Sequence, residues 1–282
     1  KVRILNALKK KGNIVAMTGD GINDAPAIKK ADIGIAVGAG TDVAKEASDM
    51  ILLDNNFHSI VKAVEEGRGI YDNIKRFVNY LLSSNFGEVL IIFIAILIGF
   101  RDEFGNIALP LGALELLWIN LVTDGLPALA LGVDTITKDI MDKKPRKIKE
   151  KIISKTMMLN ILATSLVMAL IVLFLFSKYL GESLLKAQTI AFTSIVILEM
   201  VRVLMIRSQY NLKLFSNKWL ILAVLSSISL QILVVYTPLS KIFKTVQLNI
   251  LEWSYILFAA VLMFMFGTLA NKLIKRFTKE LD

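Results

Sequence analysis

The sequence of 282 residues contains no cysteine and a single histidine, His58. Disulfide bonds and thiolate metal sites are therefore excluded within it, and so is a histidine-rich metal site. The first residues, KVRILNALKKKG, contain neither an apolar core nor a small-residue cleavage site, so no signal peptide is predicted there. They also begin without methionine and in the middle of a pattern, and we expect the chain to be the C-terminal piece of a longer protein.

Apolar residues, by contrast, are abundant and unevenly distributed. They make up 55% of the sequence, and the mean hydropathy is +0.61, although 33 residues are Lys or Arg. Most long apolar runs follow Phe77, whereas the first part resembles a soluble protein. This division predicts two domains, a soluble one at residues 1–70 and a membrane domain at residues 71–282.

In the soluble part, short apolar runs alternate with helical patterns. Such alternation predicts an α/β fold with a parallel sheet, whose ligands bind at the carboxyl ends of the strands. The predicted strands are 13–17, 33–37 and 50–53, and the predicted helices are 24–30, 41–48 and 58–66.

One loop, TGDGINDAP at residues 18–26, follows the first predicted strand. Its two glycines permit close backbone approach, and Asp20, Asn23 and Asp24 offer hard oxygen atoms. Mg²⁺ is typically held by one or two carboxylates together with phosphate and water, and the following helix N-terminus favours phosphate. The alternative is a loop in which Asp and Asn serve only as turn and cap residues.

The stretch 71–100 begins with charged residues and ends in a long apolar run. As one helix it would be about 45 Å long, which exceeds a bilayer core of about 30 Å. We therefore expect it to begin in water and to cross a membrane. Asn85 and Glu88 lie three residues apart on one face, and a carboxylate at that depth indicates a functional site. The alternative is a glutamate that reaches back to the interface.

Six candidate spans are predicted, and lysine and arginine orient them. Sixteen such residues occur in loop 133–155, region 202–218 and the C-terminal tail, against five in the opposite segments. The head, loop 133–155 and the tail are therefore predicted to be cytoplasmic. This topology explains the net charge of +9 without nucleic-acid binding. The spans are 77–100, 111–132, 157–179, 187–206, 219–236 and 253–273.

The second span carries another group of oxygen atoms. Asn120, Thr123 and Asp124 occur at i, i+3 and i+4 and share a helical face, and Gly125 and Pro127 are expected to loosen the helix just after them. Together with Asn85 and Glu88, these residues provide five oxygen-bearing side chains on two adjacent helices. Such a set favours Ca²⁺ over Mg²⁺, because Ca²⁺ accepts 6–8 oxygen ligands in a flexible shell. A single Asn or Thr here would more often join two helices.

The segment TGDGINDAPAIKKADIGIAVG, residues 18–38, resembles the hinge motif of the P-type ATPases. These cation pumps are built on a haloacid-dehalogenase-like phosphorylation domain. The resemblance implies that Asp20 is a Mg²⁺ ligand and that Asn23 and Asp24 organise the phosphate site. Lys1 lies nineteen residues before Asp20, where the family has a lysine that contacts the aspartyl phosphate.

The segments SSNFGE and LLWINLVTDGLPALALG resemble the ion-binding helices of the sarcoplasmic-reticulum-type calcium pumps. Sodium/potassium pumps are similar here but carry Asp where this chain has Asn120. Glu199, within ILEM, matches a further carboxylate of the same site, and its alternative is an ion pair with Arg202 one turn later. The pattern implies two calcium sites, although the second also needs a glutamate from outside this sequence. The implied calcium ligands are Asn85, Glu88, Asn120, Thr123, Asp124 and Glu199.

No Asp-Lys-Thr-Gly sequence occurs, so we expect the phosphorylated aspartate, the nucleotide and actuator domains and four membrane helices to lie outside this chain, which should be inactive alone. The resemblance implies an ATP-driven pump that exports Ca²⁺ from the cytoplasm, with ATP and Mg²⁺ as cofactors and the bilayer and the N-terminal part of the pump as partners. A pump for Mn²⁺, Na⁺ or H⁺ and a truncated, non-catalytic membrane scaffold remain alternatives. The tail carries no retrieval signal, so a cell membrane is expected.

Overall fold

The computed structural model describes residues 1–54, 56–146, 150–210 and 212–279. Contacts divide the chain into two compact units. The first comprises Lys1–Gly69 and Lys138–Lys151, and the second comprises Ile70–Thr137 and Ile152–Asp282.

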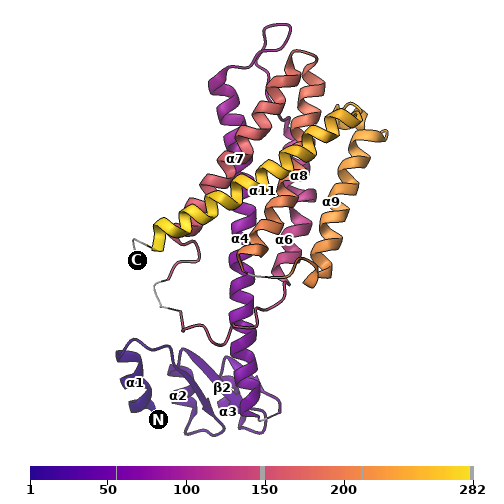
Figure 1. Cartoon of the computed structure of the whole chain (residues 1–282). Coiled ribbons are helices and arrows are strands. Elements are labelled where there is room, and N and C mark those ends of the chain that lie inside the picture. The colour runs from indigo at the N-terminus through magenta and orange to yellow at the C-terminus, as the bar shows by residue number, and fades with distance from the viewer. Residues whose placement is uncertain (55, 147–149, 211, 280–282) are drawn as a thin grey trace. The chain divides into compact units, whose positions relative to one another are not determined.

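The first unit contains a three-stranded parallel sheet with strand order β1-β2-β3. In the register, Ala16 of β1 lies opposite Ile33 of β2, and Ile35 of β2 lies opposite Met50 of β3. A helix connects each pair of strands, as parallel pairing requires. The predicted parallel α/β arrangement is therefore confirmed. The elements are α1 (Val2–Lys10), β1 (Ala16–Gly19), α2 (Ala25–Lys30), β2 (Ile33–Val37), α3 (Asp42–Glu46) and β3 (Met50–Leu52) (Figure 1).

The observed element boundaries differ from the predicted ones for local reasons. Asn13 lies outside β1 because its backbone and side-chain amides both donate to the carbonyl of Leu8 and close the end of α1, a helix that was not predicted. Thr41 caps α3, because its hydroxyl accepts the backbone N–H of Ala44.

One helix, α4, runs from Phe57 to Ile98 and belongs to both units. Its 42 residues correspond to about 63 Å at ~1.5 Å per residue. The separate helix predicted at 58–66 is thus the first part of α4. The helix continues through Gly67 and Gly69, so these glycines do not interrupt it.

Six helices in the described part of the chain are long and apolar enough to cross a membrane, which confirms the predicted number. The second of them is composite, with α5 (Ala113–Trp118), the π-helix η1 (Ile119–Thr123) and α6 (Gly125–Gly132). Two other membrane helices begin at a residue whose side chain caps them, Ser154 for α7 and Asn217 for α9. The remaining helices are α7 (Lys155–Leu180), α8 (Leu184–Gln209), α9 (Lys218–Tyr236) and α11 (Ile250–Lys279), with the short η2 (Leu214–Ser216) and α10 (Ser240–Phe243).

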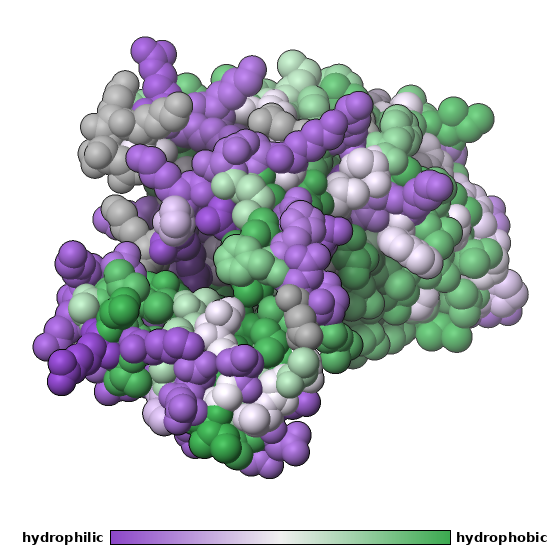
Figure 2. All heavy atoms as spheres, turned by 90° about the horizontal axis from the view of Figure 1, so that it is seen from below, coloured by the Kyte–Doolittle hydropathy of each residue, from purple (hydrophilic) through white to green (hydrophobic). Residues whose placement is uncertain are grey.

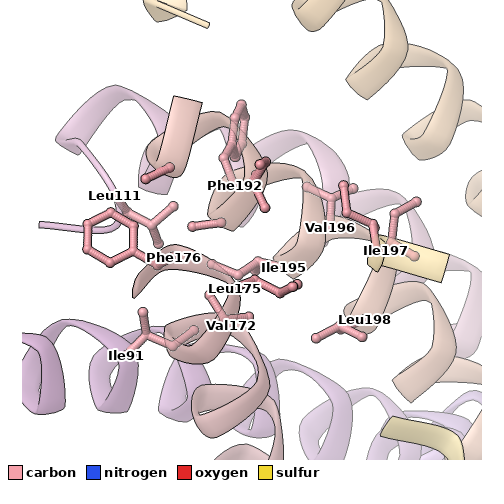
Figure 3. Close-up of a cluster of buried hydrophobic side chains, with 14 of the residues drawn as sticks. Ile91, Leu111, Val172, Leu175, Phe176, Phe192, Ile195, Val196, Ile197 and Leu198 are labelled. Atoms are coloured by element: carbon pink, nitrogen blue, oxygen red, sulfur yellow. The ribbon is translucent and has the colours of Figure 1, made fainter. Parts of the chain in front are cut away.

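The core of the second unit forms where α4, α7 and α8 meet. Ile91 of α4, Val172 and Phe176 of α7 and Phe192 of α8 belong to one buried hydrophobic cluster, which Figure 3 shows. In α8, 89% of an apolar 18-residue segment is buried, so this helix is enclosed by its neighbours. Polar side chains on α8 therefore face other helices rather than lipid.

The outer surfaces of the other helices remain apolar. Phe93, Phe174 and Phe258 each expose more than half of their surface, and Figure 2 shows broad hydrophobic areas between charged side chains. Apolar surface on this scale is typical of contact with lipid. The chain is a multi-pass membrane protein.

A buried ionic network ties the second unit together around Asp134, which follows α6. Arg207 of α8 donates to both carboxylate oxygens, from Nε at 2.9 Å and from Nη2 at 3.1 Å. Arg76 of α4 lies 3.4 Å away, and Asn217 at the start of α9 donates at 3.1 Å. The Arg76, Asp134 and Arg207 side chains are inaccessible to solvent. One carboxylate therefore joins four segments of the bundle.

We expect Asp134→Ala to lower the free energy of unfolding by about 3–5 kcal/mol, because two buried guanidinium groups would lose their carboxylate partner. Thermal unfolding of the purified protein in detergent would measure the loss. Glu103→Ala removes the same charge from an exposed loop and should change stability by less than about 0.5 kcal/mol. Equal effects of the two substitutions would contradict a structural role for the network.

Candidate functional site

Three carboxylates meet inside the second unit. Glu88 of α4, Asp124 between η1 and α6, and Glu199 of α8 each place an oxygen within 4.8 Å of the other two, and all three residues are buried. Glu88 Oε1, Asp124 Oδ2 and both oxygens of Glu199 have no hydrogen-bond partner. Buried carboxylates without partners are unfavourable, and a bound cation relieves both their mutual repulsion and their lost hydration. The arrangement can therefore bind a cation that prefers oxygen ligands.

Neighbouring side chains hold two of these carboxylates in place. Asn120 Nδ2 donates to Glu88 Oε2 at 2.7 Å, and the Tyr80 hydroxyl donates to Asp124 Oδ1 at 2.7 Å. In each case one oxygen is held and the other is free for a ligand. Tyr80 was not among the predicted site residues, although residues 80, 84 and 88 are spaced along one face of α4.

The π-helix η1 gives Asp124 its position. The backbone N–H of Asp124 donates to the carbonyl of Ile119, five residues earlier, at 2.9 Å. The helix was predicted to loosen after Asp124, at Gly125 and Pro127, but the wide turn precedes Asp124. Pro127 cannot donate to the carbonyl of Thr123, and the Ser227 hydroxyl of α9 donates to it instead, at 3.0 Å.

The other predicted ligands are arranged differently. Asn85 is exposed, and its amide donates to the carbonyl of Leu81 on its own helix at 2.7 Å. The Thr123 hydroxyl donates to the carbonyl of Ile119 at 3.1 Å. The structure thus brings together the three carboxylates and Asn120, whereas the side chains of Asn85 and Thr123 bond within their own helices. The prediction that Asn120, Thr123 and Asp124 share one face assumed a regular α-helix. The wider turn of η1 changes the direction in which each of these side chains points.

The alternative reading of Glu199, an ion pair with Arg202, is not what the structure contains. Arg202 donates from Nε to Ser83 Oγ and from Nη2 to Asn79 Oδ1, each at 3.2 Å. Both Glu199 oxygens remain without a hydrogen-bond partner.

In the first unit, the predicted phosphate-site residues lie at the carboxyl end of β1. Lys1 Nζ lies 2.7 Å from Asp24 Oδ1. The hydrogen bond from this ammonium group lowers the pKa of Asp24, and partial desolvation opposes the shift. A Cβ atom on Gly19 would lie 2.5 Å from that of Asp24, so only glycine permits this approach.

Asp20 and Asn23 are exposed in the same loop, and the Asp20 carbonyl accepts the backbone N–H of Thr41 at 2.8 Å. An exposed carboxylate beside Asp24 supplies the hard oxygens that Mg²⁺ prefers and leaves room for the water molecules that it retains. The donor set therefore fits this ion.

Comparison with known families decides the assignment of the chain. Residues 108–274, more than half of its length, match the family described as "Cation transporting ATPase, C-terminus". The chain belongs to the cation-transporting ATPases. Residues 2–64 match the haloacid dehalogenase-like hydrolases, which confirms the predicted fold class of the first unit.

Curated relatives agree with this assignment. The chain is 44% identical to calcium-transporting ATPase type 2C member 1 of Pongo abelii over an alignment of 265 positions, which covers 91% of this chain and 28% of that protein. It is also 44% identical to a calcium-transporting ATPase of Bacillus subtilis (strain 168), covering 91% of this chain and 29% of that protein. Calcium-transporting ATPase 1 of Bacillus cereus is 42% identical, with 93% and 31% covered. This member of the family thus spans less than a third of the length of these relatives.

We expect Lys1→Gln to raise the pKa of Asp24 toward its usual value, because the substitution removes the ammonium donor. The pKa of Asp24 is lower in the folded state than in the unfolded state. The contact with Lys1 therefore stabilises the fold fully above about pH 4, and this stabilisation is lost as the pH falls through the folded-state pKa. A ¹³C titration of the Asp24 carboxyl group would measure the change. Lys11→Gln, an equal charge change at an exposed residue, should leave that titration unaltered.

Proposed function

We propose that the chain is the C-terminal part of an ATP-driven pump that exports Ca²⁺ from the cytoplasm through an aspartyl-phosphate cycle. The observation that carries this proposal is the group of unpartnered oxygens of Glu88, Asp124 and Glu199 inside the membrane helices. The relatives are calcium-transporting ATPases by name, which supports the same ion.

The chemistry of the donors favours Ca²⁺ as the transported ion. All candidate ligands are oxygens from carboxylate, amide or hydroxyl groups, which match a flexible shell of 6–8 oxygens. Asn85, Asn120 and Thr123 complete the proposed ligand set by exchanging their present hydrogen bonds for the ion. Mn²⁺ accepts similar ligands and is the nearest alternative, followed by Na⁺ and H⁺.

The first unit supplies part of a phosphoryl-transfer site in this proposal. Asp20 would hold Mg²⁺, which when bound neutralises charge on the transferred phosphoryl group. Asn23 and Asp24 orient the phosphate site, and the Lys1 ammonium, 2.7 Å from Asp24, keeps that carboxylate ionised and adds positive charge there. The phosphorylated aspartate and most ATP contacts would lie outside this sequence.

Covalent connections couple the two units. The chain passes between them after residues 69, 137 and 151, and the continuous α4 carries Glu88 into the cation site. Arg68, near the unit boundary, donates to the carbonyls of Ile140 and Lys143 at 2.9 Å each and fastens the loop between α6 and α7 to α4. The phosphorylation state can change cation binding only if its two forms differ in cation affinity, and these connections supply the mechanical route.

We propose that the phosphorylation-domain part ends near residue 70 and that the membrane domain follows it. The head, the loop 133–155 and the C-terminal tail face the cytoplasm of a cell membrane in this proposal. Arg202 and Arg207 are buried in the bundle and do not bear on topology, but the remaining lysines and arginines still favour this orientation.

Phosphorylation of the full-length protein by labelled ATP, titrated with Ca²⁺, Na⁺ and Mn²⁺, tests the proposal. We expect Ca²⁺ to be required and Asp124→Asn to weaken its apparent affinity by about tenfold or more, because a carboxylate charge is lost from the site. Glu115→Gln is the matched control, since Glu115 is buried on the same membrane span but accepts the backbone N–H of Gly112, and Ca²⁺ dependence should persist.

The other outcomes distinguish the alternatives. A requirement for Na⁺ or Mn²⁺ in place of Ca²⁺ would keep the pump and change its ion. Absence of a phosphoenzyme with every ion would favour the truncated scaffold instead.

A further inference from the structure

A polar cavity lies at one end of the bundle, where α7 begins and α11 ends. It offers about 210 Å³, far more than the roughly 10–15 Å³ that one water molecule needs. Its walls come from α4, the first turns of α7 and the C-terminal ends of α8 and α11. Most of the described lining residues are polar, and none of them belongs to the cation site. The cavity is therefore a second place in the bundle where a polar ligand can bind.

The charges around this cavity favour an anionic group. Lys75 of α4 and Lys275 of α11 line it, and so do Ser154 and Thr156 at the N-terminus of α7. The first N–H groups of a helix have no partner within the helix and carry partial positive charge, so they favour phosphate. Among the described lining residues none is Asp or Glu. A phosphate group thus fits the chemistry of these walls.

One buried side chain indicates a second feature of the ligand. Asn160 lies on α7 one turn after Thr156, lines the cavity and is 4% exposed. Its Oδ1 atom has no hydrogen-bond partner. A buried acceptor without a partner is unfavourable, and ionised phosphate oxygens cannot satisfy it because they donate no hydrogen bond. The ligand should therefore carry an N–H or O–H group next to its phosphate.

The position of the cavity indicates that such a ligand comes from the membrane. Lys75, Ser154 and Lys275 each lie two or three residues outside a predicted membrane span. Further into the spans, Leu159 of α7 is 46% exposed and Leu269 of α11 is 52% exposed. A phospholipid places its phosphate at the level of such lysines and its acyl chains against such apolar surface. Basic cavities between membrane helices are typical sites for its headgroup.

We propose that this cavity binds a phospholipid headgroup, with the phosphate beside Lys75, Lys275 and the N-terminus of α7, and with a headgroup N–H or O–H donating to Asn160 Oδ1. Ethanolamine, glycerol and serine headgroups contain such a donor, whereas choline contains none. The bound lipid joins the ends of four helices and uses no ligand of the transported ion.

Native mass spectrometry of the full-length protein, delipidated in detergent, measures lipid affinity for each variant. We expect phosphatidylethanolamine to bind about fivefold more tightly than phosphatidylcholine, which has the same net charge but cannot donate to Asn160. Lys275→Gln should weaken the binding of both lipids about fivefold, because a positive charge is lost beside the phosphate. Asn160→Leu, a substitution of similar size, should remove the preference and leave phosphatidylcholine binding unchanged.

Lys272→Gln is the matched control, since Lys272 is exposed on the same helix but does not line the cavity. This variant should bind both lipids like the wild type. Thermal unfolding in lipid-free detergent shows whether each variant is folded.

Equal affinity of the wild type for the two lipids would overturn the inference, because Asn160 would then receive no hydrogen bond from the ligand. Equal effects of Lys275→Gln and Lys272→Gln would also overturn it, since lipid would then bind around the bundle rather than in the cavity. Displacement of the lipid by an equal concentration of glycerophosphoethanolamine, which has the same headgroup but no acyl chains, would replace the lipid with a soluble phosphodiester. The measurement uses neither Ca²⁺ nor ATP, so failure of the proposed function would leave its outcome unaffected.

Discussion

The repulsion among three buried carboxylates is the constraint on which the membrane part of this chain depends. Glu88, Asp124 and Glu199 come from three different helices, and in the absence of a cation nothing described in the chain neutralises all of them. The helices stay together because α7, α8 and α11 pack extensively and because Asp134 joins four segments through hydrogen bonds. A bound cation would then stabilise the bundle as well as fill the site, because a ligand that binds only the folded state adds to the free energy of unfolding.

The carboxylates of the two polar clusters in the bundle differ in how completely they are hydrogen-bonded. Around Asp134, Arg76, Arg207 and Asn217 surround a single carboxylate, both of whose oxygens accept hydrogen bonds, and Asn73 donates to the backbone carbonyl of the same residue. At the cation site, by contrast, four carboxylate oxygens have no partner. Satisfied buried networks rigidify a fold, whereas unsatisfied ones mark positions where a ligand enters. The contrast separates structural from functional charge within one membrane domain.

Sequence patterns predicted the parallel sheet, the residues of β2 and the number of membrane helices, because these follow from hydrophobic periodicity and length. They did not predict that α4 continues through Gly67 and Gly69, where the cooperativity of a long helix outweighs a cost of ~1 kcal/mol per glycine. Within the site, spacing identified Glu88 and Asp124 but not their orientation, and Glu199 was implied only by the family resemblance. The π-helix leaves no periodic signal, and Tyr80 gains its role only from a contact with a helix distant in the sequence.

The π-helix Ile119–Thr123 also constrains how this segment can change in evolution. It accommodates one residue more than an α-helix would in the same turn. If the same residues formed a regular α-helix instead, everything that follows would be rotated by about 100°. Asp124 would then no longer face Glu88 and Glu199. The geometry of this turn therefore matters to the site as much as the identity of its residues, and a substitution that straightened the turn would change the site without replacing a ligand.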